Sequence, residues 1–438
     1  MIQSLLFLII TGYAGLRAYQ SYSAVYRNIH LGKNDVVLGD SSSRWRNVFL
    51  IALGQKKMFK NIIPAVLHLF IYTAFLLTQI ELIEIFIDGI FGQHRFFSQP
   101  LGEFYTFIIS LIEILSFLAL IATIIFLIRR NILKVSRFEK PEMEGFPKLD
   151  ANLILFGEIL LITGIVCMNG ADKVLQTLLP EHYHPTGNFA ISSWLGTTLF
   201  ENLSTGVLIA IERFGWWLHF LVVLAFINYL PFSKHFHIFL AFPNTYFAKL
   251  SPKGEISNMP EVMNEVKAML GMPDAQPPST ELPVFGAKDI FDLSWRDILG
   301  AYSCTECGRC TAACPANLTG KKLSPRKIMM NVRDRAEEIG KVMDVSEDEL
   351  TKENYDDGKS LFDYISKEEI NACTTCNSCV EACPILINPL DIILQLRRYE
   401  ILTESAGPKD WTPMFNSLEN SGAVWQMPVE RAAWASEA

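Results

Sequence analysis

The sequence predicts a mainly α-helical protein, in which a five-helix transmembrane bundle precedes a smaller helical domain rich in cysteine. Three observations favour this fold class. Half of the 438 residues are hydrophobic and the mean hydropathy is +0.24, as in chains that are partly embedded in a membrane. The apolar residues gather in long runs before residue 233, whereas eight of the nine cysteines lie in two short segments after residue 300. Helix-start signals follow each of these two segments.

Five apolar runs are long enough to cross a hydrocarbon core, which takes about 20 residues of α-helix. The predicted spans cover approximately residues 2–20, 61–88, 103–128, 151–169 and 209–232. The first run also has the length of a signal peptide, but no basic residue precedes it and Arg17 follows its apolar core. We therefore predict a membrane helix there as well.

Basic residues predict how these helices are oriented. They crowd the connections after the first and third spans, with Arg27, Lys33, Arg44, Arg46, Lys56, Lys57 and Lys60 in one and Arg129, Arg130, Lys134, Arg137, Lys140 and Lys148 in the other. The two remaining connections carry Arg95 and Lys173. By the positive-inside rule, the N-terminus lies outside and the chain after the fifth span lies in the cytoplasm.

The net charge of −8 argues against a nucleic-acid partner.

The cysteine-rich segments are two copies of one motif. CTECGRCTAACP at 304–315 and CTTCNSCVEACP at 373–384 both follow the pattern Cys-x2-Cys-x2-Cys-x3-Cys-Pro. Such a run gives three thiolates to one iron–sulfur cluster and its fourth thiolate to the other cluster of a two-cluster protein. We therefore predict two [4Fe-4S] clusters, one bound by Cys304, Cys307, Cys310 and Cys383 and the other by Cys373, Cys376, Cys379 and Cys314.

Zinc sites or disulfides are the alternatives for these cysteines, because Cys-x2-Cys pairs also occur in zinc ribbons. Two full-length copies, each closed by Cys-Pro, favour iron–sulfur clusters instead. The ninth cysteine, Cys167, lies in an apolar run, so no further set of cysteines remains for structural disulfides. Thiolate clusters need a reducing compartment, which again places this half of the chain in the cytoplasm.

The composition divides the chain into four segments. We predict a transmembrane domain at 1–245, a linker rich in Pro, Gly and Ser at 246–300, the two-cluster domain at 301–405 and a C-terminal tail at 406–438. In the two-cluster domain, Ser324-Pro325 and Asn388-Pro389 precede helical patterns. Ser or Asn followed by Pro is a strong helix-start signal, so helices rather than strands are predicted to frame the clusters.

Histidines near the inner ends of two spans form a second pattern. His68 lies shortly after the cytoplasmic start of the second span, and His237 lies near the inner end of the fifth. In a continuous helix of about 3.6 residues per turn, His219 and His237 would share one face about 27 Å apart, with His235 on nearly the opposite side. Disturbance of this register by Pro231 is the alternative. The matched depth of His68 and His237 predicts that both ligate one haem b. An interhelical hydrogen bond is the alternative.

The role of His219 is open between three alternatives. No histidine lies in the outer half of the second, third or fourth span to pair with it. A second haem would need an unusual ligand such as Met168, or a loop histidine: His94, His182 or His184. Hydrogen bonding to a quinone and simple packing are the other two alternatives.

Three carboxylates lie within apolar runs: Glu81, Glu113 and Glu158. Carboxylates buried in hydrocarbon tend to be protonated or paired, and they often lie on proton routes. Since quinone reduction takes up protons, these residues are candidates for a proton relay at a quinone site. Helix pairing, or snorkelling to the interface, is the alternative. Glu84 and Asp88 are expected to mark the outer water boundary.

Two stretches of the chain resemble known families. LHFLVVLAFINYLPFSKHFHIF, within the first 245 residues, is similar to the fifth helix of the cytochrome b subunits of respiratory nitrate reductase and membrane heterodisulfide reductases. Residues 286–400, with FGAKDIFDLSWRDILGAYSCTECGRCTAACPA and GKKLSPRKIMM, resemble the α-helical ferredoxin part of heterodisulfide-reductase-like proteins and electron-transfer-flavoprotein:menaquinone reductases. The resemblance implies that His68 and His237 ligate an inner haem and His219 an outer one. This chain has Thr78 at the position where the family has the second ligand of its outer haem, which is a departure from the family pattern.

The C-terminal tail departs from these relatives. Many of them continue into a region with two cysteine-rich CCG motifs, whereas no cysteine follows Cys383 here. We therefore expect a cytoplasmic partner subunit of the CCG type. The tail carries residue types that interface cores favour, so we predict that it docks this partner through Trp425, Met427, Arg431 and Trp434. A frayed terminus is the alternative.

The resemblance implies an electron-transfer subunit of a quinone-linked oxidoreductase in the cytoplasmic membrane of a bacterium or archaeon. Its clusters and haem b would relay electrons between a cytoplasmic partner, such as an electron-transfer flavoprotein, and menaquinone in the lipid bilayer. The alternative is a membrane anchor or redox sensor without quinone chemistry, although the sequence contains no recognisable output domain.

Overall fold

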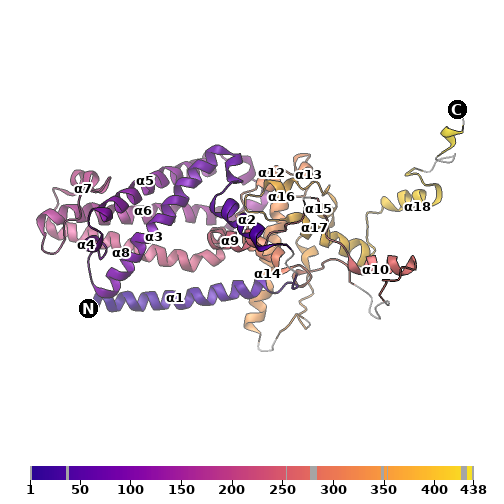
Figure 1. Ribbon diagram of the computed structural model, residues 1–438, viewed down its shortest axis with the longest axis horizontal. Helices are drawn as coiled ribbons and strands as arrows, with labels where there is room; N and C mark the ends of the chain where they lie inside the picture. The colour runs from indigo at the N-terminus through magenta and orange to yellow at the C-terminus, as the bar shows by residue number, and fades with distance from the viewer. Residues whose placement is uncertain are drawn as a thin grey trace.

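The computed structural model describes residues 2–35, 39–252, 254–276, 284–346, 350–352, 354–425 and 432–436. Within these ranges every extended regular element is helical, and β-pairing is limited to an isolated parallel bridge between Lys33 and Ser294. Figure 1 shows an elongated molecule, with long helices at one end and a group of shorter helices at the other. The predicted fold class is therefore confirmed.

Five helices of the described chain are long and apolar enough to cross a membrane, and each corresponds to one predicted span. They are α1 (Ile2–Ile29), α3 (Ile62–Phe91), α5 (Glu103–Asn131), α6 (Phe146–Leu178) and α8 (Thr205–Tyr229). Three short helices lie in the connections between them: α2 (Ser41–Asn47), α4 (Ser98–Leu101) and α7 (Ser192–Phe200).

Helices α6 and α8 approach each other closely because glycines lie where they cross. A Cβ atom on Gly215 would lie 2.6 Å from the carbonyl oxygen of Gly164, which is too close for any side chain. A Cβ atom on Gly164 would in turn lie 3.1 Å from the Cβ of His219. Small residues allow such backbone contact between membrane helices. The crossing therefore places His219 directly against the backbone of α6.

The end of the fifth span corrects one expectation. Helix α8 ends before Pro231, and two short 3₁₀ turns separate it from α9 (His237–Phe247). Proline has no amide hydrogen for the helical ladder, and its ring clashes with the preceding turn. The expectation of a continuous helix with His219 and His237 on one face is therefore wrong, and His237 instead opens a new helix.

The cysteine-rich domain consists of short helices around the longer α14. Its elements are α11 (Trp295–Tyr302), α12 (Arg309–Ala312), α13 (Pro315–Leu318), α14 (Pro325–Val345), α15 (Lys367–Asn371), α16 (Ser378–Ala382) and α17 (Pro389–Arg398). Both predicted helix starts are confirmed, because Ser324 caps α14 by accepting a hydrogen bond from the Lys327 N–H and Asn388 caps α17 in the same way. Fully buried residues such as Ile328 and Ile392 form the core between these helices.

The C-terminal end of α1 is part of the same core. Ile29 is buried among residues of the cysteine-rich domain, and the side-chain amide of Asn28 donates a hydrogen bond to the Tyr302 hydroxyl at 3.1 Å. Just beyond the helix, the N–H of Lys33 donates to the carbonyl oxygen of Leu293 at 2.7 Å. These contacts attach the domain to the membrane bundle.

The two basic connections lie against the cysteine-rich domain. The Lys57 ammonium donates to the carbonyl oxygen of Val380 at 3.3 Å, and the Lys140 ammonium donates to the Asn317 side chain at 3.2 Å. The basic connections and the cysteines thus share one end of the bundle, as the positive-inside rule requires if both are cytoplasmic. The side of the membrane on which this end lies remains a prediction.

Two helices extend away from the rest of the molecule, α10 (Pro260–Met269) and α18 (Trp411–Ser421). In the predicted docking tail, Trp425 and Trp434 are exposed, whereas Met427 and Arg431 lie outside the described residues. Partner docking by this tail therefore remains a prediction.

Candidate redox centres and a cavity between the membrane helices

Two cavities in the cysteine-rich domain are each surrounded by four cysteines. The first cysteine group consists of Cys304, Cys307, Cys310 and Cys383, and the second consists of Cys314, Cys373, Cys376 and Cys379. Each group combines three cysteines of one motif with the last cysteine of the other. The structure thus brings together the two sets of residues that the sequence predicts as ligands. Which residues ligate which cluster remains a prediction.

The two motif loops have the same backbone geometry. In each loop the residues on either side of the second cysteine have positive φ angles: +53° at Glu306 and +70° at Gly308, and +55° at Thr375 and +60° at Asn377. Such left-handed residues turn the chain sharply. The repeated turns bring the first three cysteines of each motif to one side of their loop.

Several thiols of the two groups are buried, and burial disfavours their thiolate form. Burial, together with neighbouring thiols, raises the pKa of Cys304 and of Cys379 to about 12, and burial raises the pKa of Cys383 to about 11. Thiolates persist in such surroundings only beside positive charge, which iron would supply. The N–H of Ile387 also donates a hydrogen bond to the Cys383 sulfur at 3.3 Å, a contact that stabilises a thiolate ligand.

The spacing of the thiols suits a cluster better than a single ion. No three His, Cys, Asp or Glu side chains in the described ranges converge closely enough to hold one metal ion. A tetrahedral zinc site needs such convergence, with Zn–S bonds of about 2.3 Å. A cube of iron and sulfur keeps its four thiolates further apart. The two donor sets therefore fit [4Fe-4S] clusters.

His68 on α3 and His237 at the start of α9 face each other, with ring centres 6.5 Å apart. Since a metal–imidazole bond is about 2 Å long, two imidazoles on opposite sides of one ion have ring centres roughly 6 Å apart. The Nδ1 of His68 lies 3.1 Å from Oε1 of Gln55, and that of His237 lies 3.1 Å from the carbonyl oxygen of Lys234. Nδ1–H groups that donate to oxygen leave both Nε2 atoms free for a metal, so this pair fits a haem iron.

The turn before α9 joins this histidine pair to the first cysteine group. The buried Lys234 forms an ion pair with Glu306, which lies between Cys304 and Cys307. Glu306 also pairs with Arg333 of α14 at 2.8 Å. The loop of the first cysteine group is therefore anchored to the residues that precede His237.

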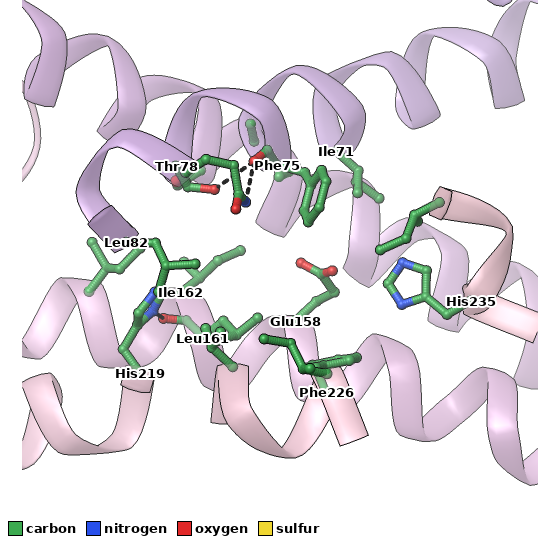
Figure 2. Close-up of a pocket in the computed structure, with 18 of the residues that line it drawn as sticks. Ile71, Phe75, Thr78, Leu82, Glu158, Leu161, Ile162, His219, Phe226 and His235 are labelled. Atoms are coloured by element: carbon green, nitrogen blue, oxygen red, sulfur yellow. Dashed lines mark hydrogen bonds between the residues drawn. The ribbon is translucent and has the colours of Figure 1, made fainter. Parts of the chain in front are cut away.

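A cavity of about 180 Å³ lies between α3, α5, α6, α8 and α9. Its walls are mainly apolar, and Figure 2 shows the carboxyl group of Glu158 pointing into it between His219 and His235. Glu158 makes no hydrogen bond or ion pair with any described residue. Sequence reasoning gave His235 no role, because only the packing of the turn before α9 brings it to the cavity.

His219 lines this cavity with one nitrogen free. Its Nδ1 lies 3.1 Å from the carbonyl oxygen of Leu161, and a carbonyl only accepts hydrogen bonds, so Nδ1 carries the proton. Among the residues considered as a second haem ligand, Met168 packs in an apolar cluster with Phe7 and Trp216. Neither Met168 nor a loop histidine lines the cavity.

Glu81 and Glu113 lie elsewhere, in a buried polar network toward the end of the bundle that is remote from the cysteine-rich domain. The side-chain amide of Asn169 lies 3.4 Å from Glu81 and 3.3 Å from Glu113. Glu113 also accepts hydrogen bonds from the backbone N–H groups of Ile191, at 2.8 Å, and Ser192, at 3.0 Å. These contacts join α5, α6 and α7, which favours the helix-pairing alternative for Glu113. One carboxyl oxygen of Glu81 is buried without a hydrogen-bond partner.

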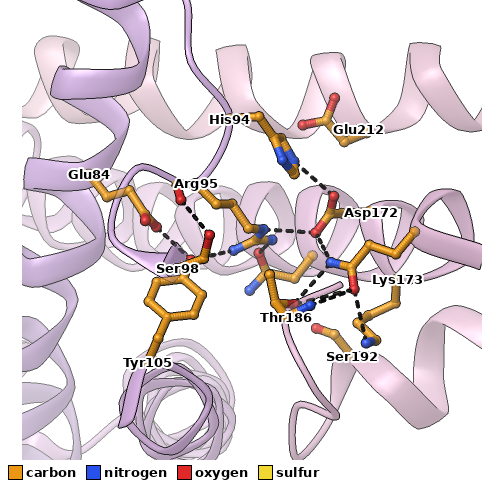
Figure 3. Close-up of polar contacts among 12 residues, drawn as sticks. Glu84, His94, Arg95, Ser98, Tyr105, Asp172, Lys173, Thr186, Ser192 and Glu212 are labelled. Atoms are coloured by element: carbon orange, nitrogen blue, oxygen red, sulfur yellow. Dashed lines mark hydrogen bonds and ion pairs between the residues drawn. The ribbon is translucent and has the colours of Figure 1, made fainter. Parts of the chain in front are cut away.

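Arg95 is the centre of this network, as Figure 3 shows. It donates to Asp172 at 2.7 Å, to Asn169 at 2.7 Å and to the Tyr105 hydroxyl at 3.0 Å. Tyr105 in turn donates to Glu84 at 2.7 Å, and Glu84 is only 3% exposed. The expectation that Glu84 marks the water boundary is therefore wrong, because the loop with Arg95 folds back over it. The sequence signal that could have revealed this network is Arg95 itself, a single arginine in a connection that is poor in basic residues.

Residues 303–387 match the family of 4Fe-4S dicluster domains. This range contains all eight cysteines of the two groups. Binding of 4Fe-4S clusters by the cysteine-rich domain is therefore supported by three findings: the motif, the cavities and the family match.

Three curated relatives are similar to the chain. "Probable iron-sulfur-binding oxidoreductase FadF" of Bacillus subtilis is 29% identical over 99% of this chain and 61% of its own length. "EtfAB:quinone oxidoreductase" of Syntrophomonas wolfei is 25% identical over 93% of this chain and 56% of its own length. "Probable membrane-anchored ferredoxin" of Chromohalobacter salexigens is 30% identical over 35% of this chain and 24% of its own length. No solved structure shows significant similarity to the chain.

The chain thus spans 61% and 56% of the length of the two relatives that cover most of it. Five apolar helices and a 4Fe-4S dicluster domain make it a membrane iron–sulfur protein of the electron-transfer type. The resemblance inferred from the sequence agrees with these relatives.

Proposed function

We propose that the chain carries electrons between a soluble flavoprotein and quinone in the membrane. The route consists of two [4Fe-4S] clusters, held by the two cysteine groups, and one haem b held by His68 and His237. The observation that carries the proposal is the contact between the loop of the first cysteine group and the turn that precedes His237.

The second cysteine group lies at the end of the route that a soluble partner can reach. Cys376 is exposed, whereas Cys314 and Cys379 of the same group are buried. The first cysteine group is joined to the turn before α9 by the ion pair of Lys234 with Glu306. Electrons entering near Cys376 would therefore pass the first cysteine group before they reach the membrane.

The residues between the first cysteine group and the histidine pair keep these centres close. The ion pair of Lys234 with Glu306 joins the first motif loop to the turn that precedes His237. Gln55 and the backbone of Lys234 hold the two imidazoles in one tautomer. When bound, the clusters and the haem would take up and release one electron at a time.

The relative named EtfAB:quinone oxidoreductase supports the choice of an electron-transfer flavoprotein and quinone as electron-transfer partners. The basic connections beside the cysteine-rich domain support a cytoplasmic position for the clusters. A cytoplasmic subunit with CCG motifs is the alternative soluble partner. The competing function is a membrane anchor or redox sensor, which would carry the clusters without exchanging electrons with quinone.

Metal content and spectra of the anaerobically purified chain test the proposal. We expect about eight iron atoms in clusters for each chain, in addition to haem iron. A menaquinone analogue should then oxidise the dithionite-reduced haem and clusters. Zinc in place of iron would contradict the cluster assignment. Clusters that do not respond to the analogue would instead favour the anchor or sensor.

Single substitutions test the haem ligands. His68→Ala and His237→Ala should each remove a low-spin haem signal, because either change leaves the iron with one axial imidazole. His30→Ala, which alters an exposed histidine at the inner end of α1, is the matched control and should keep the signal. Loss of the signal in His235→Ala, with His237→Ala unaffected, would overturn the assignment of His237.

A further inference from the structure

We propose that the cavity between α3, α5, α6 and α8 binds the headgroup of the quinone, with Glu158 and His219 as its hydrogen-bond partners. This inference rests on the proposed function, which names quinone as the electron carrier in the membrane but assigns it no binding site.

The walls of the cavity suit a flat, mainly apolar ring. Ile71, Phe75 and Leu82 of α3 line one wall, and Ile162 of α6 and Phe226 of α8 line others. Sites for small organic molecules typically combine such an apolar lining with a few polar groups that fix the orientation of the ligand. A quinone headgroup has this character, because two carbonyl oxygens lie on opposite edges of an apolar ring.

Glu158 and His219 carry polar atoms that are free to meet such a ligand, and Ser116 and His235 also line the cavity. Thr78 and Gln79 also line the cavity, but they donate to the carbonyl oxygen of Phe75 on their own helix at 3.1 and 2.9 Å, as the dashed lines in Figure 2 mark. Glu158 has no partner among the described residues, and the Nε2 of His219 is the unprotonated nitrogen of its ring.

The chemistry of these two groups matches both redox forms of the ligand. An unpaired carboxylate within the bilayer is costly, so Glu158 carries a proton that it can donate to a quinone carbonyl. The Nε2 of His219 can accept a hydrogen bond from the hydroxyl of a quinol. A haem held by His219 would need a second ligand; among the described lining residues the other histidine is His235, and Figure 2 shows the Glu158 carboxyl group between the two imidazoles.

The inner end of the cavity adjoins the proposed haem ligands. His235 lines the cavity, and its ring centre lies 5.7 Å from that of His237. The Nδ1 of His235 is buried without a hydrogen-bond partner. A headgroup in the cavity would therefore be separated from the His237 imidazole by a single aromatic ring.

Reduction of the bound quinone adds two electrons and two protons, one proton to each carbonyl oxygen. The iron centres of the proposed function deliver the electrons one at a time. The carboxyl proton of Glu158 passes to the oxygen it contacts, and the carboxylate left behind takes a proton from water. The proton for the other oxygen also comes from water, and the resulting hydroxyl donates to His219.

Binding of heptyl-hydroxyquinoline N-oxide, a fluorescent quinol analogue, tests the site on the purified holoprotein. Glu158→Leu and His219→Ala should each weaken binding by about tenfold, because each leaves one polar atom of the ligand without a hydrogen bond. Glu103→Leu, at an exposed carboxylate on α5, is the control and should bind as wild type does. Glu158→Gln should keep binding within about threefold while slowing quinone reduction, since an amide can donate a hydrogen bond but has no proton to release.

Haem and cluster spectra of the same samples separate the outcomes. Weakened binding with unchanged spectra, and photo-cross-linking of an azido-naphthoquinone to α6 and α8, would support the site. Wild-type binding in both Glu158→Leu and His219→Ala would overturn it and leave the proposed function intact. Loss of a haem signal in His219→Ala would also overturn it, in favour of haem ligation. Absence of clusters from the wild-type chain would overturn the proposed function itself.

Discussion

The first and second cysteine groups share one motif and one pair of left-handed residues, yet the molecule surrounds them differently. The first motif loop contains Glu306, which is buried and pairs with Lys234 and Arg333. The corresponding residue of the second loop is Thr375, which is half-buried and carries no charge, and Cys376 next to it is exposed. A sequence repeat therefore produces the same local turn twice, while the position of each loop in the fold decides its charge neighbours and its contact with solvent.

This difference fits the two roles that the proposed function gives to the two clusters. The first cysteine group is held rigidly against the membrane bundle by buried ion pairs, which suits a centre that exchanges electrons with the histidine pair. The second cysteine group is open to solvent at Cys376, which suits a centre that meets a soluble partner. Cluster potentials respond to solvent exposure and to hydrogen bonds at sulfur, so the two clusters should also differ in potential.

Replacing the fourth cysteine of either motif gives the largest expected effect. Cys314 belongs to the first motif but lines the second cavity, and Cys383 belongs to the second motif but lines the first. Cys314→Ser should abolish the signal of the second cluster in electron paramagnetic resonance, and Cys383→Ser should abolish that of the first. The reverse pattern of losses would show that each motif binds its own cluster and would remove the basis of the comparison.

The buried ion pairs predict the next largest effect. Burial alone would raise the pKa of Glu306. The Lys234 ammonium and the Arg333 guanidinium nevertheless hold this pKa below its usual range. Glu306→Gln should lower the free energy of unfolding by about 3 kcal/mol, because it leaves two buried cations without their carboxylate. Chemical denaturation in detergent measures this loss.

The matched control lies beside the second cysteine group. Lys60 and Glu381 form an ion pair in which both side chains are largely exposed. Glu381→Gln should therefore cost less than about 1 kcal/mol, as expected for a surface ion pair. Equal losses in the two variants would mean that burial does not distinguish the surroundings of the two groups.

Solvent access predicts a smaller, kinetic difference. Hydrogen bonds with Ser378 lower the pKa of Cys376, and the side chain is exposed. An iron chelator should therefore remove the second cluster before the first, and iodoacetamide added afterwards should modify Cys376 before the buried cysteines. Mass spectrometry of the modified peptides gives the order, and earlier modification of Cys304 would contradict it.

The smallest effect concerns pH. Burial, followed by the neighbouring Asp391 carboxylate, raises the pKa of Asp297 on α11 to about 7. The folded state then holds a proton that the unfolded state has released, so stability falls as pH rises through 7. The free energy of unfolding should drop by roughly 1 kcal/mol between about pH 6 and pH 8. Asp297→Asn should remove this dependence, and an unchanged pH profile in that variant would assign it to another group.

Local and periodic features of this protein could be predicted from the sequence. The apolar runs mark all five membrane helices, and Ser324 and Asn388 mark the starts of α14 and α17. The cysteine spacing predicts the two groups that the structure brings together. These features depend on neighbouring residues and on the reach of a short loop, so the order of amino acids is enough to specify them.

Contacts between distant segments were decided by the tertiary structure. His68 and His237 face each other, although the continuous helix used to align His237 ends before Pro231. The same break brings His235 to the cavity, and the fold of one loop turns Arg95 into the centre of a buried network. A single proline or a folded-back loop redirects every side chain that follows it, and helical periodicity holds only while the helix is unbroken. Which side chains meet across the bundle therefore depends on how the helices pack, a property that no stretch of sequence carries by itself.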